Sequence, residues 1–488
     1  MSHPPAELFG STPLAQRRAK IVCTIGPASS SEEMIRQLML SGMDVARLNF
    51  SHGRHEDHAQ VIALLRKVAA ALKRTICILQ DLQGPKIRTG RLADDVPVAL
   101  AKGQTVTITS RDVVGTADRI ATTYQDLAKD VNPGEHILLS DGRIELVVKD
   151  VRNGDVICEV LNGGMLGEHQ GINLPGTNVS IPSLTEKDEL DLEFGLKQQV
   201  DAIAISFVRT AEDVLRAERA IRSRGSDVPL VAKLEKPQAI DNLDSILEVA
   251  HGVMVARGDL GVEMAPEKVP LIQKRIIRRA LDFRRPVITA TQMLESMTEN
   301  PRPTRAEASD VANAIFDGTD AVMLSGETAV GKYPREAVEM MARIVTEAES
   351  SRLQRLVPEH QQAEHLSIAE TICESMAHAA EDLALRAIAV FTETGRTARM
   401  LSKYRPAAAI YGFTQSEALC NRMNLLWGVT PVRCPANLSM ERMTEFAESE
   451  LLRMKVLARG DVFGLIAGTR QAAGATNFMR LITAGESH

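Results

Sequence analysis

The sequence lacks closely spaced cysteines. Its six cysteines are spread over 488 residues, and no CxxC spacing occurs. A disulfide framework is therefore not indicated. Most of these cysteines lie in apolar runs, which is typical of buried free thiols in a cytosolic protein. We accordingly expect a cytoplasmic protein.

Long hydrophobic runs and a surplus of positive charge are also missing. No uninterrupted apolar stretch approaches the roughly 20 residues that span a bilayer. The N-terminal segment has no apolar core typical of a signal peptide. We expect no membrane partner, and we expect residues 1–17 to be a disordered lead-in. The net charge of −6 provides no general basic face, so we expect no nucleic-acid partner.

What the chain does have is length and a regular alternation of short strands and helices. Its 488 residues exceed what one hydrophobic core usually serves, so we expect three domains. Three strand-like runs separated by helical stretches occupy residues 20–82, and five more, each followed by a helix, occupy residues 202–327. Eight such units predict a TIM barrel over residues 18–84 and 185–350. A doubly wound sheet is the alternative.

The segment between the third and fourth of these strands has a different pattern. Residues 85–184 contain strand-like runs without helices, such as GQTVTITS and GDVICEVLNGG. This pattern predicts an inserted all-β domain, a small barrel. Residues 351–488 alternate strands and helices again, which predicts a separate α/β domain with a mainly parallel sheet.

Polar side chains stand at the ends of the barrel strands. Active sites of TIM barrels lie at the carboxyl ends of the strands, so these side chains are expected to meet in one pocket. Their mixture of cations, carboxylates and hydroxyls suits a phosphorylated, carboxylated substrate bound with a metal ion. The residues are Arg47, Asn49, Ser51 and His52 on the second strand, Asp81 on the third, Lys233 and Glu235 on the fifth, Gly258 and Asp259 on the sixth, Thr291 on the seventh, and Ser325 and Glu327 on the eighth.

Lys233, Glu235 and Asp259 are the most informative of these residues. Lys233 and Glu235 stand two residues apart, and residues i and i+2 of a strand point the same way. Asp259 ends the next apolar run. Two carboxylates on neighbouring strand ends can hold a hard divalent cation such as Mg²⁺ or Mn²⁺. A lysine beside that cation can stabilise a phosphoryl group in transit.

Seven long motifs stand in order along the chain: RLNFSHG at 47–53, DLQGPKIRTG at 81–90, GINLPG at 171–176, VARGDLGVE at 255–263, ATQMLESM at 290–297, PRPTRAEASDVANA at 301–314 and MLSGETAVGKYP at 323–334. From about Lys20 to the C-terminus, the chain resembles the pyruvate kinase family. The resemblance implies a barrel, a β lid domain and a C-terminal regulatory domain, assembled as a homotetramer. It also implies phosphoryl transfer from phosphoenolpyruvate to ADP, giving pyruvate and ATP, the last step of glycolysis.

The resemblance implies roles for the strand-end residues. Glu235 and Asp259 would hold the divalent ion, and the backbone around Gly258 and Asp259 would receive the substrate carboxylate. The enolate left after transfer would be protonated through a hydroxyl and water relay. Lys233 is a second candidate for that proton, but its acidic neighbours should keep it charged. The implied catalytic residues are Lys233, Arg47, Thr291 and Ser325, and the implied substrate contacts are Arg47, Lys233, Gly258, Asp259 and Thr291.

The resemblance places the nucleotide beside Asn49, Ser51 and His52 and, at the hinge into the lid, beside Arg88. Many relatives carry a lysine just before GVNLPG, where this chain has Gln170 before GINLPG. The lid of this chain therefore has a neutral side chain where many relatives offer a positive charge to the nucleotide.

The monovalent cation site of the family also differs here. Many relatives bind K⁺ with groups matching Asn49, Ser51, Asp81 and the carbonyl of Leu82. They carry glutamate in GPEIR, where this chain has Lys86 in GPKIR. Because Lys86 supplies a fixed positive charge, we expect the chain not to require K⁺.

The run FTETGRTARM in the C-terminal domain predicts a phosphate pocket at a helix start. In the family this position binds the phosphate of an allosteric activator, and AGTRQAAGATN would be the facing loop. That loop differs from the Pro- and Gly-rich loop of fructose-bisphosphate-activated relatives, which favours a sugar monophosphate or a nucleotide monophosphate. An ordinary capped helix is the alternative. The residues concerned are Thr392, Thr394, Gly395, Arg396 and Thr397.

Two other functions fit parts of the pattern. A different barrel enzyme acting on phosphoenolpyruvate or pyruvate, such as a mutase or an aldolase-type lyase, would share the metal carboxylates. It would need neither a nucleotide lid nor an effector domain. A non-catalytic metabolite sensor would keep the fold and bind an effector without turnover.

Overall fold

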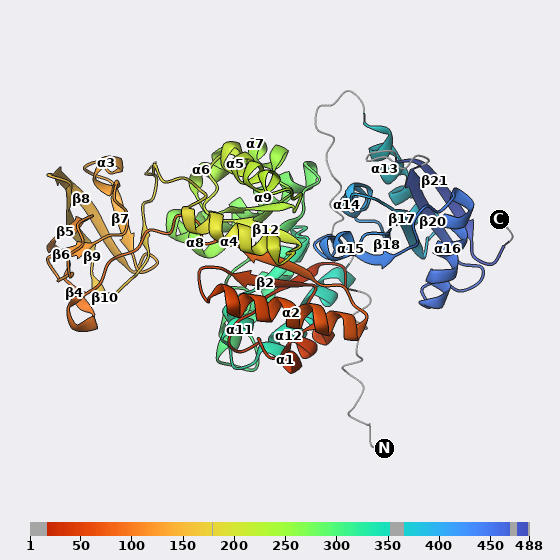
Figure 1. Cartoon of the computed structure of the whole chain (residues 1–488), viewed down its shortest axis with the longest axis horizontal. Helices are drawn as coiled ribbons and strands as arrows, with labels where there is room; N and C mark the ends of the chain where they lie inside the picture. The colour runs from red at the N-terminus through yellow and green to blue at the C-terminus, as the bar shows by residue number, and fades with distance from the viewer. Residues whose placement is uncertain (1–16, 178, 352–365, 469–475, 487–488) are drawn as a thin grey trace, which may run out of the picture.

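The computed structural model describes residues 17–177, 179–351, 366–468 and 476–486. Nearly all of the expected lead-in (1–17), the linker over 352–365 and most of the AGTRQAAGATN loop lie outside these residues. The described chain forms three parts in a row, with the β-rich insertion at one end, the barrel in the middle and the C-terminal sheet at the other end (Figure 1).

Eight parallel strands close into a ring in the order β1-β16-β15-β14-β13-β12-β3-β2. The ring closes where β1 pairs with β16, with Lys20 beside Ala321. This topology confirms the predicted TIM barrel and excludes a doubly wound sheet. The strands are β1 Lys20–Thr24, β2 Val45–Asn49, β3 Cys77–Asp81, β12 Ala202–Ile205, β13 Leu230–Leu234, β14 Gly252–Ala256, β15 Val287–Ala290 and β16 Ala321–Leu324.

Amphipathic helices pack their apolar faces on the outside of the ring. The first begins where Ser31 accepts the N–H of Met34, and it ends at Gly42, whose φ of 126° suits glycine. The helices around the barrel are α1 Glu32–Ser41, α2 His55–Leu72, α4 Glu186–Lys197, α5 Ala211–Ser223, α6 Pro237–Asp241, α7 Leu243–Val249, α8 Arg257–Glu263, α9 Val269–Asp282, α10 Arg305–Phe316, α11 Gly326–Ala329 and α12 Pro334–Ser350, with short 3₁₀ turns η3 Pro266–Lys268 and η4 Glu295–Thr298.

The insertion between β3 and β12 is built of β-strands around its own apolar core. It holds a six-stranded sheet in the order β11-β7-β8-β9-β5-β6 and a two-stranded sheet of β10 and β4. It also contains a short helix, so the expectation of strands alone was incomplete. The elements are η2 Ala93–Asp95, β4 Val98–Leu100, β5 Thr105–Thr109, β6 Arg119–Ala121, α3 Leu127–Asp130, β7 His136–Leu139, β8 Ile144–Arg152, β9 Asp155–Asn162, β10 Gly164–Leu166 and β11 Ile172–Asn173.

The insertion begins at the carboxyl end of a barrel strand. β3 ends at Asp81 and pairs with β12, with Leu79 beside Ala202, although the whole insertion separates these strands in sequence. The insertion is therefore attached at the end of the barrel where active sites of this fold are built.

The C-terminal part contains a five-stranded sheet in the order β19-β18-β17-β20-β21. Four strands are parallel, and β21 runs antiparallel to β20 at the edge. This agrees with the predicted mainly parallel α/β sheet. The elements are α13 Ile368–Asp382, β17 Ala387–Phe391, α14 Arg396–Lys403, β18 Ala409–Thr414, α15 Glu417–Met423, β19 Val429–Arg433, α16 Met440–Arg453, β20 Val462–Gly468 and β21 Thr476–Thr483.

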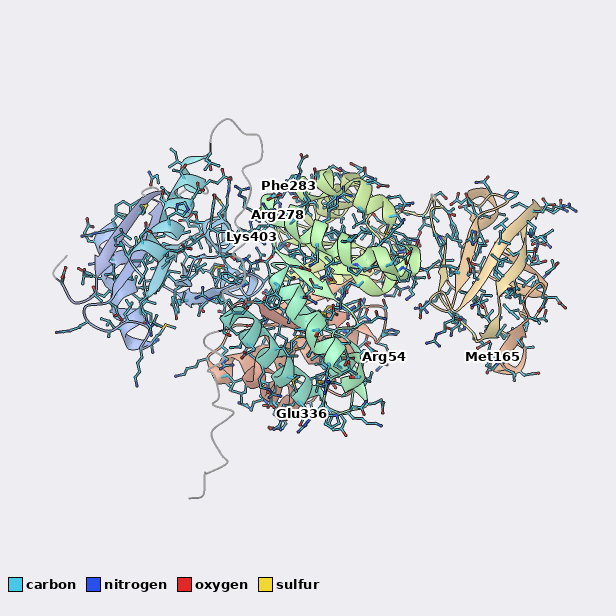
Figure 2. All side chains as sticks on the ribbon, turned by 180° about the vertical axis from the view of Figure 1, so that it is seen from behind. Arg54, Met165, Arg278, Phe283, Glu336 and Lys403 are labelled. Atoms are coloured by element: carbon cyan, nitrogen blue, oxygen red, sulfur yellow. The ribbon has the colours of Figure 1, made fainter. Side chains whose placement is uncertain are left out.

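The C-terminal part meets the barrel at the amino ends of its strands. Lys20, the first residue of β1, donates to the carbonyl of Val429 at 2.8 Å. Lys403 at the end of α14 pairs with Asp320, which directly precedes β16, and Figure 2 shows Lys403 at this junction. This contact lies at the opposite end of the barrel from the insertion.

Two expectations from composition can be compared with the structure. All six cysteines are free, and five of them are buried. Among the residues in the described ranges, no helix has both the length and the apolar character that crossing a bilayer requires.

Candidate active site

The carboxyl ends of the barrel strands hold a buried cluster of charges centred on Lys233. Its ammonium lies 2.9 Å from Glu235 Oε1 and 3.3 Å from Asp81 Oδ1. It also donates to Ser206 Oγ at 2.7 Å. Burial alone would lower the pKa of Lys233, but the carboxylates of Asp81 and Glu235 outweigh it and raise the pKa above its ordinary value. Lys233 is therefore held in place and charged.

Arg47 joins the same cluster from β2. Its Nε lies 2.7 Å from Asp81 Oδ2, and its Nη1 donates to Thr24 Oγ1 at 2.9 Å. Burial alone would raise the pKa of Asp81, but Lys233 and Arg47 together hold it below its ordinary value. One buried carboxylate thus orients Lys233 and Arg47, the two cations that the resemblance implies to be catalytic.

Glu235 and Asp259 face the same space beside Lys233. Burial raises the pKa of Glu235, Lys233 opposes that effect, and the negative charge of Asp259 adds to it. Glu235 Oε2 also accepts the backbone N–H of Phe207 at 2.8 Å. Asp259 lies in the first turn of α8, which directly follows β14.

These two carboxylates fit a hard divalent cation that keeps water and substrate oxygens. Within the described ranges, no three His, Cys, Asp or Glu side chains are grouped to hold a metal by themselves. Mg²⁺ is commonly bound by one or two carboxylates and completed by water and phosphate oxygens. The donor set of Glu235 and Asp259 matches that chemistry.

Thr291 occupies a strained position at the end of β15. Its φ of 69° is unusual for a β-branched residue, and such strain often marks functional sites. Its hydroxyl donates to the carbonyl of Ala290 at 2.7 Å and accepts the N–H of Gly258 at 2.8 Å. Arg257 Nη2 donates to the carbonyl of Thr291 at 2.7 Å. The N–H of Gly258, which was expected to meet a substrate carboxylate, is therefore engaged by Thr291 in this structure.

Ser325 and Glu327 follow β16 and differ in their surroundings. The hydroxyl of Ser325 is buried and has no hydrogen-bond partner in the described part of the chain. Glu327 accepts the backbone N–H of Ser325 at 2.6 Å and that of Leu294 at 3.0 Å. Burial raises the pKa of Glu327. Glu327 therefore holds two neighbouring loops together, while the Ser325 hydroxyl has no partner among the described residues.

The groups expected to bind a monovalent cation are engaged by donors of the chain. Asn49 Oδ1 accepts the N–H of Ser51 at 3.1 Å. The carbonyl of Leu82 accepts the hydroxyl of Ser206 at 2.8 Å. Asp81 is paired with both cations of the cluster. Asn49 Oδ1 and the Leu82 carbonyl therefore have hydrogen-bond partners within the chain, whereas Asp81 Oδ1 faces the Lys233 ammonium at 3.3 Å without a hydrogen bond among the described residues.

His52 and Arg88, which were expected beside the nucleotide, lie close to two further cations, Lys86 and Arg47. Burial lowers the pKa of His52, and the positive charges of Arg88, Lys86 and Arg47 lower it further. Arg88 is half-buried and donates to the carbonyl of His169 at 3.1 Å. Arg88, Lys86 and Arg47 thus make this region, where the insertion joins the barrel, positively charged.

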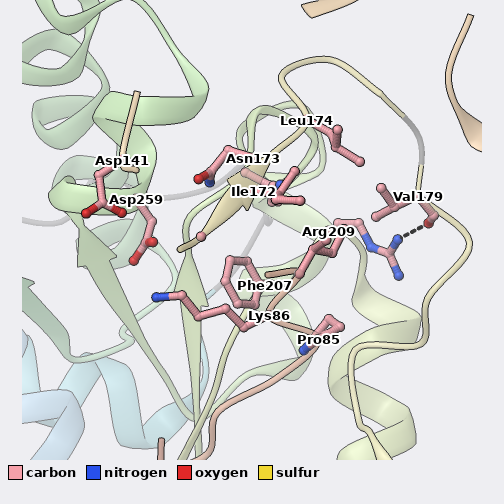
Figure 3. Close-up of a pocket in the computed structure, with 13 residues that line it drawn as sticks. Pro85, Lys86, Asp141, Ile172, Asn173, Leu174, Val179, Phe207, Arg209 and Asp259 are labelled. Atoms are coloured by element: carbon pink, nitrogen blue, oxygen red, sulfur yellow. Dashed lines mark hydrogen bonds between the residues drawn. The ribbon is translucent and has the colours of Figure 1, made fainter. Parts of the chain in front are cut away.

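A pocket lies between the insertion and the barrel, with a volume of about 560 Å³ that includes space open to solvent. Figure 3 shows Lys86 pointing toward Asp259 and Asp141 across this pocket. Lys86 thus faces the carboxylate expected to hold the divalent ion. The lining residues are Pro85, Lys86, Ile87, Asp141, Gly171, Ile172, Asn173, Leu174, Val179, Phe207, Arg209, Lys236 and Asp259.

Some polar groups of the predicted effector loop already form hydrogen bonds within the C-terminal domain. Gly395 adopts φ 78° at the start of α14, and its N–H donates to Thr392 Oγ1 at 3.0 Å. The hydroxyls of Thr397 and Thr476 share a buried hydrogen bond of 2.6 Å. Two of the hydroxyls expected to face a phosphate therefore have partners inside the domain, while Thr394 and Arg396 are exposed.

Two family models match this chain. The model for the pyruvate kinase barrel domain matches residues 16–338, and the model for the pyruvate kinase alpha/beta domain matches residues 370–482. The chain belongs to the pyruvate kinase family. It is therefore assigned to the phosphotransferases, as the sequence motifs indicate.

Individual pyruvate kinases resemble the chain over nearly its whole length. Those of Staphylococcus epidermidis (strain RP62A) and Staphylococcus aureus (strain MRSA252) are each 46% identical over 474 residues, which is 96% of this chain and 81% of theirs. The crystal structure of a pyruvate kinase from Cryptosporidium parvum is 36% identical with a TM-score of 0.91, and the match covers 97% of this chain and 98% of that one.

Two residues that follow β12 contact the candidate site although the sequence did not indicate them. Ser206 links Lys233 to the carbonyl of Leu82, and Phe207, with φ 56°, presents its N–H to Glu235. Their place at the carboxyl end of a barrel strand was the available signal.

A contact between the insertion and the barrel was also missed. Lys236 pairs with Glu263 at 2.5 Å, and Asn173 of the insertion donates to the same carboxylate at 2.9 Å. No local pattern indicates this contact, because it forms only when the insertion meets the barrel.

Proposed function

We propose that the chain transfers the phosphoryl group of phosphoenolpyruvate to ADP and so releases pyruvate and ATP, as the last step of glycolysis. The observation that carries the proposal is the pairing of Lys233 and Arg47 through Asp81, directly beside Glu235 and Asp259. A migrating phosphoryl group spreads negative charge over its oxygens, so fixed cations lower its transfer barrier.

Each cation has a distinct part in the proposal. Arg47 presents a planar fork that suits two phosphoryl oxygens, while Lys233 supplies a compact charge from the other side. Glu235 and Asp259 hold a Mg²⁺ or Mn²⁺ ion, which when bound neutralises charge on the substrate oxygens. The backbone around Gly258 and Asp259 receives the substrate carboxylate, which displaces the contact between Gly258 and Thr291.

Thr291 and Ser325 are proposed to relay the proton that converts the enolate to pyruvate. Displacement of the Gly258 contact frees the Thr291 hydroxyl, and the Ser325 hydroxyl has no partner among the described residues. Lys233 is a poorer donor, because two carboxylates raise its pKa and keep its proton.

The nucleotide is proposed to lie against Asn49, Ser51, His52 and Arg88, below the insertion. In this arrangement the insertion closes over the pocket and excludes water, so that ADP rather than water accepts the phosphoryl group. Gln170, which donates to the carbonyl of Glu168 at 3.1 Å, offers no charge to the nucleotide.

We propose further that a monovalent cation is not required. Lys86 points across the pocket toward Asp259 (Figure 3), so its charge replaces the one that K⁺ supplies in many relatives. Asn49 Oδ1, the Leu82 carbonyl and Asp81 Oδ2 already accept hydrogen bonds from the chain, which supports that idea.

The remaining proposals concern the whole protein. The barrel of residues 18–84 and 185–350 is catalytic, residues 85–184 form the lid, and residues 351–488 form a regulatory domain. The enzyme is a cytoplasmic homotetramer that a phosphorylated metabolite activates. The free, mostly buried thiols support the cytoplasmic location.

The experiment that tests the central proposal is an assay of pyruvate release from phosphoenolpyruvate with and without ADP, in the presence of Mg²⁺. We expect pyruvate and ATP in equal amounts, and no pyruvate without ADP. Pyruvate release that does not depend on ADP would point to a lyase or mutase, and effector binding without turnover would point to a sensor.

A further inference from the structure

The turn between β2 and α2 carries two of the residues that the proposed function places beside the nucleotide, Ser51 and His52. The turn is short, because β2 ends at Asn49 and α2 begins at His55. Asn49 anchors its start: the side-chain oxygen accepts the N–H of Ser51 at 3.1 Å, and the carbonyl accepts the N–H of His52 at 3.3 Å. His52 itself is exposed, so its orientation depends on what holds the far end of the turn.

His58 holds the far end of this turn. It lies in the first turn of α2, and its Nε2 lies 2.9 Å from the carbonyl oxygen of His52. Because a carbonyl can only accept, Nε2 of His58 is the donor. The imidazole also approaches Gly53, which has a φ of 79° and where an added Cβ would lie 3.2 Å from Nε2. The ring of His58 therefore packs against the turn and binds its backbone.

Phe50 fixes the orientation of the His58 ring. The two rings stack, with centroids 4.2 Å apart and an angle of 11° between their planes. Phe50 is 2% exposed, and its N–H donates to the carbonyl of Asp81 at 2.9 Å, which ties it to the end of β3. Stacked aromatic pairs favour one relative geometry, so the Nε2 of His58 stays aimed at the carbonyl of His52.

A second helix, α4, holds the same turn. Lys187 in its first turn donates to the carbonyl of Phe50 at 2.7 Å and pairs with Asp191. Asp191 is 3% exposed and also lies 2.7 Å from Nε2 of His55. The ring of His55 stacks on Phe194 of α4, with centroids 4.3 Å apart. Phe50 and the two helices thus form one packed base for the turn that carries His52.

We propose that His58 is a positioning residue for the nucleotide, because its Nε2 holds the backbone of His52 while Phe50 holds its ring. With the carbonyl fixed, the side chain of His52 is presented to ADP in one orientation. A ligand binds more tightly to a turn that is already ordered, since less conformational freedom is lost on binding. The inference rests on the proposed function, which places ADP beside Ser51 and His52.

Three substitutions separate the two contacts of His58. Phenylalanine keeps a ring on Phe50 and removes the donor. Glutamine removes the ring but keeps an amide N–H near the position of Nε2, and methionine has a similar length and neither contact. If the hydrogen bond positions the turn, His58→Phe should weaken ADP binding by about three- to tenfold, the usual net contribution of one hydrogen bond. His58→Gln should bind ADP more tightly than His58→Phe and His58→Met.

The test is equilibrium titration of the full chain with ADP in the presence of Mg²⁺, followed by steady-state kinetics. In His58→Phe the KM for ADP should rise together with the dissociation constant, whereas the KM for phosphoenolpyruvate should not rise. A merely structural role would change both. His136→Phe is the control, because His136 lies in the insertion and also faces an acceptor, Glu145, at 2.8 Å; it should bind ADP as the wild type does.

A double variant shows whether His58 acts through His52. His52→Ala removes the side chain that the turn presents but keeps the carbonyl that His58 binds. In this background the further change His58→Phe should cause no additional loss of ADP affinity, whereas two independent effects would add.

Four outcomes would overturn the proposal. They are equal ADP affinity of the wild type and His58→Phe, equal affinity of His58→Gln and His58→Met, a full additional loss in the double variant, and a parallel rise of both KM values. The comparison of His58→Gln with His58→Met still decides the matter if His58→Phe does not fold. A wild type that binds ADP without transferring a phosphoryl group would contradict the proposed function alone, and one that does not bind ADP would contradict both.

Discussion

One buried carboxylate, Asp81, organises the proposed active site at the scale of single residues. It pairs with Arg47 and Lys233 at once, and both cations favour its ionised form. The sequence predicted that these residues share a strand-end location, because the strand pattern is local. It did not predict that Asp81 is the group that joins the two cations, since the contact requires β2, β3 and β13 to meet in the closed ring.

Thr291→Val tests the proposed relay. Loss of the hydroxyl should slow proton exchange at the pyruvate methyl group together with turnover, by roughly 10²- to 10⁴-fold. NMR of pyruvate in deuterated buffer measures the exchange. Thr298→Val, which changes another buried hydroxyl in η4 beside α11, is the control and should be close to wild type. Normal methyl exchange in Thr291→Val would remove Thr291 from the relay.

Lys86→Glu tests independence from K⁺. The wild-type enzyme should be near full activity in a tetramethylammonium buffer with Mg²⁺ and without K⁺, Na⁺ or NH₄⁺. The variant places a negative charge opposite Asp259, so its activity should fall at least about tenfold and return when K⁺ is added. A strong K⁺ requirement in the wild type contradicts the proposal.

At the scale of elements, the sequence predicted the alternation of strands and helices well because apolar periodicity is local. The segment HILLSDGRIELVVKD at 136–150 has the pattern of one strand-like run, whereas Ser140, Asp141 and Gly142 adopt positive φ and split it into β7 and β8. The pattern gave no sign of the antiparallel edge strand β21. The pattern also did not indicate the contacts of Ser206 and Phe207, because these contacts depend on side chains that the closed ring brings from other strands.

Asp320→Asn tests the buried ion pairs that link the barrel to the C-terminal domain. Asp320 is 1% exposed, pairs with Lys403 and Arg405, and accepts the N–H of Val287 at 2.8 Å. Removing its charge leaves two buried cations, so the free energy of unfolding should fall by about 3–5 kcal/mol. Denaturant unfolding measures this change.

Glu299→Gln is the matched control for Asp320→Asn, because Glu299 pairs with Lys332 on the exposed surface. Its cost should be below about 1 kcal/mol. Lys403→Met should cost less than Asp320→Asn, because Arg405 still pairs with Asp320. Equal stability of Asp320→Asn and the wild type would mean that this buried network does not hold the domains together.

At the scale of the whole molecule, the barrel lies between two parts that contact its opposite ends (Figure 1). The insertion meets the carboxyl ends of the strands, where the proposed chemistry takes place. The C-terminal domain meets the amino ends through Lys403 and Asp320. The strand and helix pattern indicated these three parts and the family resemblance agreed with it, but periodicity alone could not indicate which end of the barrel each part would contact.

Arg396→Ala tests whether a phosphorylated activator bound to the C-terminal domain regulates the barrel. Velocity against phosphoenolpyruvate should be sigmoidal without activator and hyperbolic with a sugar monophosphate or a nucleotide monophosphate as the activator. The variant should lose that change and keep nearly the same maximal velocity, because Arg396 lies far from the proposed active site. Activation that survives in Arg396→Ala would place the effector elsewhere.

Lys233→Met tests the central proposal most directly. The variant removes the charge that faces the migrating phosphoryl group and keeps a side chain of similar length, so kcat should fall by several orders of magnitude while phosphoenolpyruvate still binds. Lys274→Met, which removes a surface lysine paired with Asp317, is the control and should keep its activity. Steady-state kinetics and equilibrium binding of phosphoenolpyruvate give both quantities. A kcat within about tenfold of wild type would contradict the role of Lys233 in phosphoryl transfer.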